Sequence, residues 1–187
     1  MAAATDVAGL LAARLTEDGI EFAFGGALAL AAWGVPRATI DVDVSVFVPP
    51  TDWRRVVDAL ERCGALVAAD EAERTATSIG LIVAYVAGTR VDLFLQHHPM
   101  HADMRRRRVS RHGVGDGESY FLSASDVVLT KLLYNRAKDR TDLERLFAVC
   151  GGQIDVEYVA GWLERIVGAD DERLAVLTDL RARFPGD

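Results

Sequence analysis

Ile40-Asp-Val-Asp-Val-Ser-Val-Phe-Val48 is the stretch of the sequence that decides the fold. Its valines alternate with polar residues, and this alternation predicts a β-strand because successive side chains of a strand point to opposite faces. The polar face carries Asp41, Asp43 and Ser45, and the other carries Ile40, Val42, Val44, Val46 and Val48. Carboxylates at positions i and i+2 lie about 7 Å apart along a strand. Asp41 and Asp43 can therefore converge on one or two cations.

A third acid has a similar setting in Arg90-Val-Asp-Leu-Phe-Leu95, where Asp92 alternates with apolar residues. If the two strands are neighbours, Asp92 joins Asp41 and Asp43 on one face. Asp is disfavoured in strands and adjacent carboxylates repel each other. Mg²⁺ relieves that repulsion and prefers oxygen ligands. The same short pattern is also compatible with the solvent-facing side of an edge strand.

A glycine pair, Gly25-Gly26, lies between a predicted strand at 21–24 and a predicted helix at 27–33. Glycines there let a phosphate approach the backbone, and a helix N-terminus attracts anions. A glycine pair also serves any tight turn. The succession of strand, glycine pair, helix and acidic strand predicts one site that is suited to a nucleoside triphosphate with Mg²⁺.

The remaining patterns predict mixed α and β structure in residues 1–122 and a helical region in residues 123–187. We expect helices at 6–18 and from Thr51 or Asp52 to about residue 63, and strands at 66–69, 79–86 and 90–95. The polar stretch 96–118 is expected to be a loop with a short strand near 107–109. One long helix, capped by Ser123 or Ser125, is expected through residue 147, followed by a helix from Asp155 and another at 170–183.

On that long helix, 100° per residue puts Lys131, Asn135, Lys138 and Asp142 in one narrow sector. Such a stripe is either a solvated face with spaced ion pairs or the border of a cleft. In the second case Lys131 would contact the triphosphate, and Asp142 or Asp139 would orient it. Lys131 and Lys138 are the only two lysines among 21 basic residues.

Composition restricts the partners. The 187 residues carry a net charge of −7, which argues against a broad basic face for nucleic acid. The local cluster Arg105–Arg108 is either a solvated hairpin or an RNA contact. His97, His98 and His101 lack acidic or Cys partners at zinc-ligand spacing, so a loop near the mouth of the site is favoured. With no secretory signal and no apolar stretch of about 20 residues, a cytoplasmic protein without membrane contact is expected.

Phe24-Gly-Gly-Ala-Leu28, Arg37-Ala-Thr-Ile-Asp-Val-Asp43 and Val91-Asp-Leu93 together resemble the nucleotidyltransferase superfamily of DNA polymerase β. The segment from Lys131 to Leu143 resembles the AbiEii-type branch, which includes toxins of toxin–antitoxin and phage-defence systems. The resemblance implies an α/β (α+β) fold, in which a nucleotidyltransferase core of a mixed twisted sheet flanked by helices precedes a C-terminal helical bundle. The Gly-Gly turn departs from the Gly-Ser of many relatives, which leaves only backbone amides for a phosphate.

The resemblance also implies roles. Asp41 and Asp43 would hold Mg²⁺ or Mn²⁺, and Asp92 would complete the second metal site and help to deprotonate the acceptor. The nucleotide would be contacted by Gly25, Gly26, Arg37, Thr39, Lys131, Asp139 and Asp142. The acceptor of the NTP-derived nucleotide would be RNA, protein or a small molecule, with a toxin–antitoxin partner protein as a further partner. Alternatives are an aminoglycoside-type nucleotidyltransferase and a non-catalytic nucleotide-binding or toxin–antitoxin partner protein.

Overall fold

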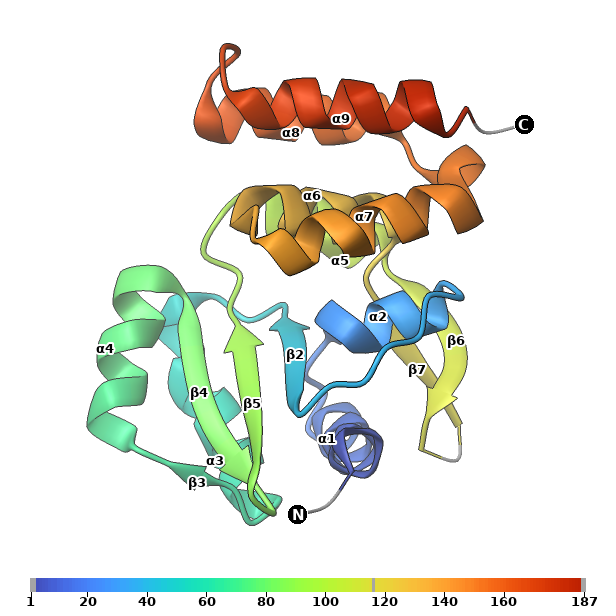
Figure 1. Cartoon of the computed structure of the whole chain (residues 1–187). Coiled ribbons are helices and arrows are strands. Elements are labelled where there is room, and N and C mark those ends of the chain that lie inside the picture. The colour runs from blue at the N-terminus through green and yellow to red at the C-terminus, as the bar shows by residue number, and fades with distance from the viewer. Residues whose placement is uncertain (1–2, 116, 186–187) are drawn as a thin grey trace.

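A seven-stranded mixed sheet forms the centre of the computed structural model, which describes residues 3–115 and 117–185 (Figure 1). The strands are β1 (Phe22–Phe24), β2 (Asp41–Val46), β3 (Leu66–Val67), β4 (Leu81–Val86), β5 (Thr89–Phe94), β6 (Val109–Val114) and β7 (Gly117–Phe121). Their order is β3-β4-β5-β2-β1-β7-β6. β2 pairs with β5, and β1 with β7, in parallel, whereas the other neighbours are antiparallel. The mixed sheet flanked by helices that the resemblance implied is confirmed.

One face of the sheet is covered by apolar side chains of α1 (Ala4–Glu17), α3 (Trp53–Arg62) and α4 (Ala69–Ile79). Val42, Val44 and Val46 of β2 point into this core and are fully buried. The alternation in β2 is thus confirmed for the valines. Ile40 is an exception, since it precedes the strand and is 80% exposed.

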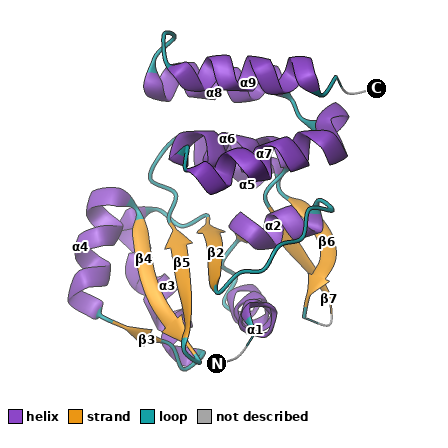
Figure 2. Ribbon diagram, in the orientation of Figure 1, coloured by secondary structure: helices purple, strands orange, loops and turns teal. Residues whose placement is uncertain are grey.

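The other side of the molecule holds α2 (Gly26–Ala32), α5 (Met100–Arg107), α6 (Ala124–Tyr134) and α7 (Ala137–Cys150), with α8 (Val156–Val167) and α9 (Glu172–Arg183) stacked beyond them (Figure 2). These helices share a second core. Its members include Leu30 of α2 and Leu122, which precede residue 123, together with Leu129 of α6 and Leu163 of α8. It therefore draws on both sides of residue 122, and the division into units 1–122 and 123–187 stays a prediction.

Two stretches differ from the sequence-based expectation. The strand expected at 66–69 ends at Val67, and α4 follows it through Ile79, where another strand was expected to begin. This helix is rich in Ala and Thr, so it lacks the large apolar residues that make periodicity visible. The predicted loop at 96–118 instead contains α5, β6 and the start of β7. Most of β6 is not buried, which explains its weak apolar signal.

The single long helix expected from residue 123 to 147 is also wrong. Ser123 does cap its start, because the Ser123 hydroxyl accepts a hydrogen bond from the Asp126 amide at 3.2 Å. The helix ends at Asn135, whose φ of +48° is left-handed. Asn tolerates this conformation better than most residues. A second helix, α7, starts beyond Arg136, and the Asp139 carboxylate accepts a hydrogen bond from the Arg136 amide at 3.2 Å.

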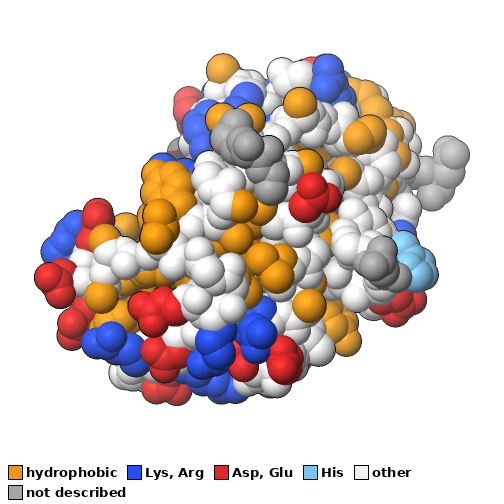
Figure 3. Space-filling view, turned by 90° about the horizontal axis from the view of Figure 1, so that it is seen from below, with side chains coloured by type: hydrophobic (Ala, Val, Ile, Leu, Met, Phe, Trp, Pro, Cys, Tyr) orange, Lys and Arg blue, Asp and Glu red, His pale blue; other side chains and the backbone are white. Residues whose placement is uncertain are grey.

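Acidic and basic side chains are intermixed on the face seen in Figure 3, with hydrophobic side chains between them. Many charged side chains of the described residues form ion pairs, for example Arg62 with Asp18, Arg74 with Glu71 and Arg90 with Asp92. None of the described helices is long and apolar enough to cross a membrane.

Candidate active site

Asp41, Asp43 and Asp92 lie on the same face of two adjacent strands. The register of the parallel pair β2 and β5 places Asp43 opposite Asp92 and Asp41 opposite Arg90. The predicted adjacency of the two acidic strands is therefore confirmed. The edge-strand alternative is wrong, because β2 lies between β5 and β1 in the interior of the sheet.

The three carboxylates create a strongly negative site. The pKa of Asp43 is raised from 3.8 to about 6, first by burial and then by the charges of Asp41 and Asp92. Arg136 and Lys131 oppose this rise through their positive charges. Asp43 is still mainly ionised at neutral pH, so the site carries repulsion that a bound divalent cation would relieve.

Asp41 and Asp92 are each held by a near neighbour. The Thr39 hydroxyl donates a hydrogen bond to the Asp41 carboxylate, and Arg90 Nε donates to Asp92 Oδ1 at 2.8 Å. In this arrangement, no three His, Cys, Asp or Glu side chains of the described residues are grouped closely enough to hold a metal ion. The donor chemistry of Asp41, Asp43 and Asp92 nevertheless fits Mg²⁺ or Mn²⁺, because all three offer carboxylate oxygens.

The glycine pair is tied to the acidic strand. The Gly25 amide donates a hydrogen bond to the Asp43 carbonyl at 2.9 Å. Gly26 has a φ of +50°, and a Cβ built there would lie 1.9 Å from Asp43 Oδ2. Gly26 is therefore required both by its backbone conformation and by the approach of Asp43. The glycine at position 26 thus has a structural reason in this fold that does not depend on a phosphate.

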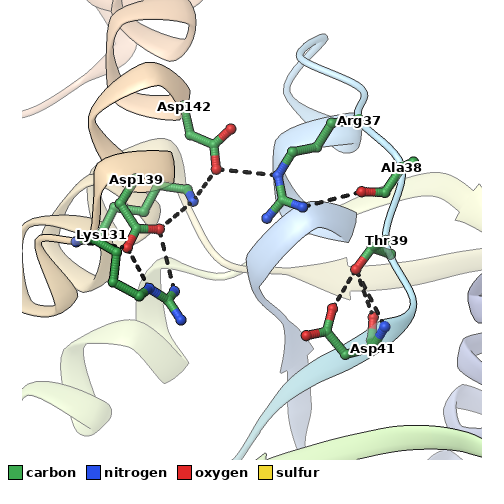
Figure 4. A network of polar contacts seen from close by, with 8 residues as sticks. Arg37, Ala38, Thr39, Asp41, Lys131, Asp139 and Asp142 are labelled. Carbon is green, nitrogen blue, oxygen red and sulfur yellow. Dashed lines mark hydrogen bonds and ion pairs between the residues drawn. The ribbon is translucent and has the colours of Figure 1, made fainter.

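A second group of charges surrounds Lys131 (Figure 4). Lys131 Nζ donates to Asp142 Oδ2 at 2.6 Å and to Asp139 Oδ1 at 3.2 Å. All three of these side chains are buried. Arg37, from the segment before β2, donates from Nε to the same Asp142 oxygen at 3.2 Å. Asp139 and Asp142 thus both contact Lys131, although the three residues lie on two helices rather than on one, and their role toward a nucleotide stays a prediction.

A cavity of about 560 Å³ brings these groups together between the sheet and helices α5 to α7. Its polar lining includes eight of the predicted residues, namely Gly25, Gly26, Arg37, Asp41, Asp43, Asp92, Lys131 and Asp139. Thr39 and Asp142 act behind the lining, because each holds a residue that lines it. Tyr134 and Arg136 also line the cavity and were missed. They flank Asn135, and the signal that would have found them is the helix break itself.

The histidines lie at another part of this cavity. His97 and His101 line it, with ring centroids 5.2 Å apart, whereas His98 packs edge-on against Trp162. Burial lowers the pKa of His101 to about 4, and burial also lowers that of His98. The His101 ring is therefore uncharged at neutral pH. The placement near the cavity agrees with the expected position, but His101 belongs to α5 rather than to a loop.

The arginine cluster Arg105–Arg108 belongs to α5 and its end, so the hairpin expected there is wrong. Its charges have partners within the chain. Arg105 and Arg108 pair with Glu21, and Arg106 pairs with Asp103. The fourth, Arg107, stacks over the Tyr158 ring at 4.1 Å. These contacts leave less of the cluster's positive charge available for RNA.

Comparison with known proteins identifies the class of this molecule. The solved structures of ANT(2'')-Ia, an antibiotic-resistance factor, resemble it along almost the whole chain. The complex with adenylyl-2''-tobramycin has a TM-score of 0.53 at 13% identity, and the match covers 96% of this chain and 98% of that one. A putative nucleotidyltransferase from H. pylori has a TM-score of 0.52 at 12% identity, covering 94% and 92%. At such identities the likeness shows the nucleotidyltransferase fold.

The family is shown by the sequence itself. Residues 9–111, more than half of the chain, match the family model described as "Nucleotidyl transferase AbiEii toxin, Type IV TA system". The chain therefore belongs to the AbiEii family of nucleotidyltransferases, and it is a nucleotidyltransferase. No curated protein matches the sequence.

Proposed function

We propose that the chain transfers a nucleotide from an NTP, with Mg²⁺ or Mn²⁺, to a hydroxyl group of an acceptor. The observation that carries this proposal is the convergence of Asp41, Asp43 and Asp92 on the wall of one cavity, beside the glycine turn and the buried Lys131. Oxygen ligands and a nearby cation are what a metal-bound triphosphate requires. The 1–122 unit would supply the acids, and the 123–187 unit would supply Lys131.

Each residue would have a defined task. Asp41 and Asp43 would hold the metal ions, and Asp92 would complete the second site close to the acceptor hydroxyl. Bound divalent ions would stabilise the attacking and leaving oxygens of an in-line displacement. Asp92 would also draw the proton from the attacking hydroxyl as the bond to the α-phosphate forms and pyrophosphate leaves.

The phosphates would be held from the opposite side of the acids. Lys131 would contact the triphosphate, and its two buried acids, Asp139 and Asp142, hold its ammonium group in place. Arg37 would contribute positive charge while Asp142 holds it. Thr39 would act through Asp41. The amide of Gly26 would lie against the phosphates, while the Gly25 amide holds the turn to the Asp43 carbonyl.

The family match supports a role in a toxin–antitoxin system, and we propose an antitoxin partner on that basis. The aminoglycoside-type alternative has only the shared fold behind it. The non-catalytic alternative would have to explain why all three acids face one cavity with a compensating lysine.

The test is transfer of label from each α-labelled NTP, with Mg²⁺, into RNA, protein or small-molecule fractions of a cell extract. Asp43→Asn should reduce transfer about 100-fold or more, because loss of metal-based charge stabilisation removes several kcal/mol. Asp58→Asn is the matched control, since this exposed carboxylate lies on α3, on the far face of the sheet. Absence of transfer with every NTP, or equal transfer by the two variants, would contradict the proposal.

A further inference from the structure

The order of the strands determines from which side an acceptor can enter. The glycine turn follows β1, Asp41 and Asp43 lie on β2, Asp92 lies on β5, and β4 comes next in the sheet. In phosphoryl and nucleotidyl transfer the attacking and leaving oxygens are roughly in line. If pyrophosphate leaves beside the glycine turn and Lys131, the attacking hydroxyl must approach from the side of β5 and β4.

That side of the cavity is apolar. Phe94 follows Asp92 on the same face of β5 and pairs across the sheet with Leu81 of β4. Ile79, His97 and Met100 continue the lining from these two residues. The acidic and basic side chains that the structure describes in the lining all come from β2, β5 at Asp92, the segment before β2, and α6 to α7. We call the surface made by Ile79, Leu81, Phe94, His97 and Met100 the apolar arm.

Within the apolar arm, the position of the His97 ring is fixed by its neighbours. Gly80 has a φ of +68°, and a Cβ there would lie 2.3 Å from His97 Nδ1. The His97 ring therefore lies directly against the Gly80 backbone, and the His97 ring nitrogen is 3.3 Å from the Leu95 carbonyl oxygen. Behind it, His101 is only 4% exposed. Together with Phe94, these rings offer flat surfaces for stacking.

We propose that the apolar arm is the acceptor subsite, and that it takes an acceptor whose hydroxyl is attached to an uncharged, planar apolar group. The inference rests on the proposed function, because it uses the in-line geometry of that reaction. A polyamine acceptor would lose hydration against these five side chains, none of which is a carboxylate, and the neighbouring Asp92 is already paired with Arg90. Unpaired buried charges are costly. The same argument distinguishes this site from one built for an aminoglycoside. The nucleotide base is the competing occupant, and the test separates the two.

The experiment measures binding to the full chain with Mg²⁺ and a non-hydrolysable ATP analogue, by NMR of the histidine ring protons. N-acetyl-L-tyrosinamide is the uncharged aromatic hydroxyl probe, and kanamycin is the polyamine probe. Ile79→Glu places a charge at the mouth of the arm, where the side chain is 56% exposed and folding should tolerate it. Val149→Glu on α7 is the matched control, because its side chain is 57% exposed and lies outside the cavity lining.

We expect the tyrosinamide probe to shift the His97 signals in the wild type and in Val149→Glu, and to bind at least fivefold more weakly to Ile79→Glu. Kanamycin should leave those signals in place. The inference is overturned if kanamycin shifts them, if the ATP analogue alone shifts them, or if the tyrosinamide probe shifts none.

Turnover is not needed for this measurement, so the two proposals fail separately. Binding of the probe without any label transfer would count against the proposed function. Label transfer without binding of the probe to the apolar arm would count against the acceptor subsite.

Discussion

Asp43 gives the sharpest prediction, because its ionisation should lower the free energy of unfolding of the metal-free protein. The pKa of Asp43 rises from 3.8 to about 6 on folding. Each pKa unit corresponds to about 1.4 kcal/mol, so ionised Asp43 costs the folded state about 3 kcal/mol. A group whose pKa is raised in the folded state binds more protons there, and stability then falls as pH rises between about 4 and 6. Asp43→Asn removes this cost, and the metal-free variant should be more stable than the wild type at neutral pH.

The magnitude should depend on pH in a defined way. Integrating the two titrations gives the variant an advantage of about 1 kcal/mol at pH 4.5 and about 3 kcal/mol at pH 7.5. For a chain of this length, the larger value corresponds to a rise in Tm of roughly 6 °C or more. The assay is urea denaturation with EDTA at both pH values, with Asp58→Asn as the control variant that should show no such change.

Divalent metal should largely cancel this difference in stability. Mn²⁺ at about 100 times its Kd should stabilise the wild type by about 2.7 kcal/mol, and should act much less on Asp43→Asn. The reasoning is refuted if the stability difference between variant and wild type is equal at pH 4.5 and 7.5. It is also refuted if Mn²⁺ stabilises both proteins equally.

Three further substitutions test the surroundings of the site by chemical denaturation. Gly26→Ala should lose about 2–4 kcal/mol of unfolding free energy, because its Cβ would lie 1.9 Å from Asp43 Oδ2 and its φ is +50°. The control Gly25→Ala should lose much less, because a Cβ at Gly25 makes no contact below 3.4 Å, and equal losses would contradict the packing argument. Lys131→Met should lose about 3 kcal/mol or more of unfolding free energy, since it leaves two buried carboxylates with fewer partners. Adding Asp142→Asn should recover part of that loss, and a double variant no more stable than the single one would contradict the role of the ion pair. Asn135→Val should lose about 1–2 kcal/mol at a φ of +48°, whereas Asn135→Gly should be nearly neutral, and the opposite ranking would show that the left-handed position does not matter.

The sequence predicts the part of the site that depends on apolar and acidic residues alternating along a single strand. In β2 the buried valines and the inward acids follow directly from the period of a strand, and Asp92 repeats the pattern in β5. The register that brings Asp43 opposite Asp92 joins residues far apart in the sequence. The sequence therefore predicts that the three acids share a face only if the two strands are neighbours. The apolar arm could not be predicted, because it joins residues from α4, β4, β5, the segment after β5 and the start of α5.

Two helices, α4 and α5, could not be predicted because their amino-acid composition hides the helical pattern. In α4 the small residues Ala72 and Ala76 form the buried face, and such residues give a weak periodic signal. In α5 the run of arginines hid a helix whose buried residues are His101 and Met104. Arg105 and Arg108 pair with Glu21, and Arg107 stacks on the Tyr158 ring, so three of the four arginines have partners far away in the sequence.

The break at Asn135 is what allows Lys131 and Asp142 to pair, although the sequence predicted them on one continuous helix. In a continuous helix, Lys131 and Asp142 would be separated by about 16 Å along the axis, and no lysine could donate to that carboxylate. The observed distance between Lys131 Nζ and Asp142 Oδ2 is 2.6 Å, which requires the chain to turn between them. Asn135 supplies the turn, and the Arg136–Asp139 capping contact starts the next helix. The turn also brings Tyr134 and Arg136 to the cavity wall. The ion pair and the turn should therefore be coupled, so that weakening either one displaces Lys131 from the acidic site.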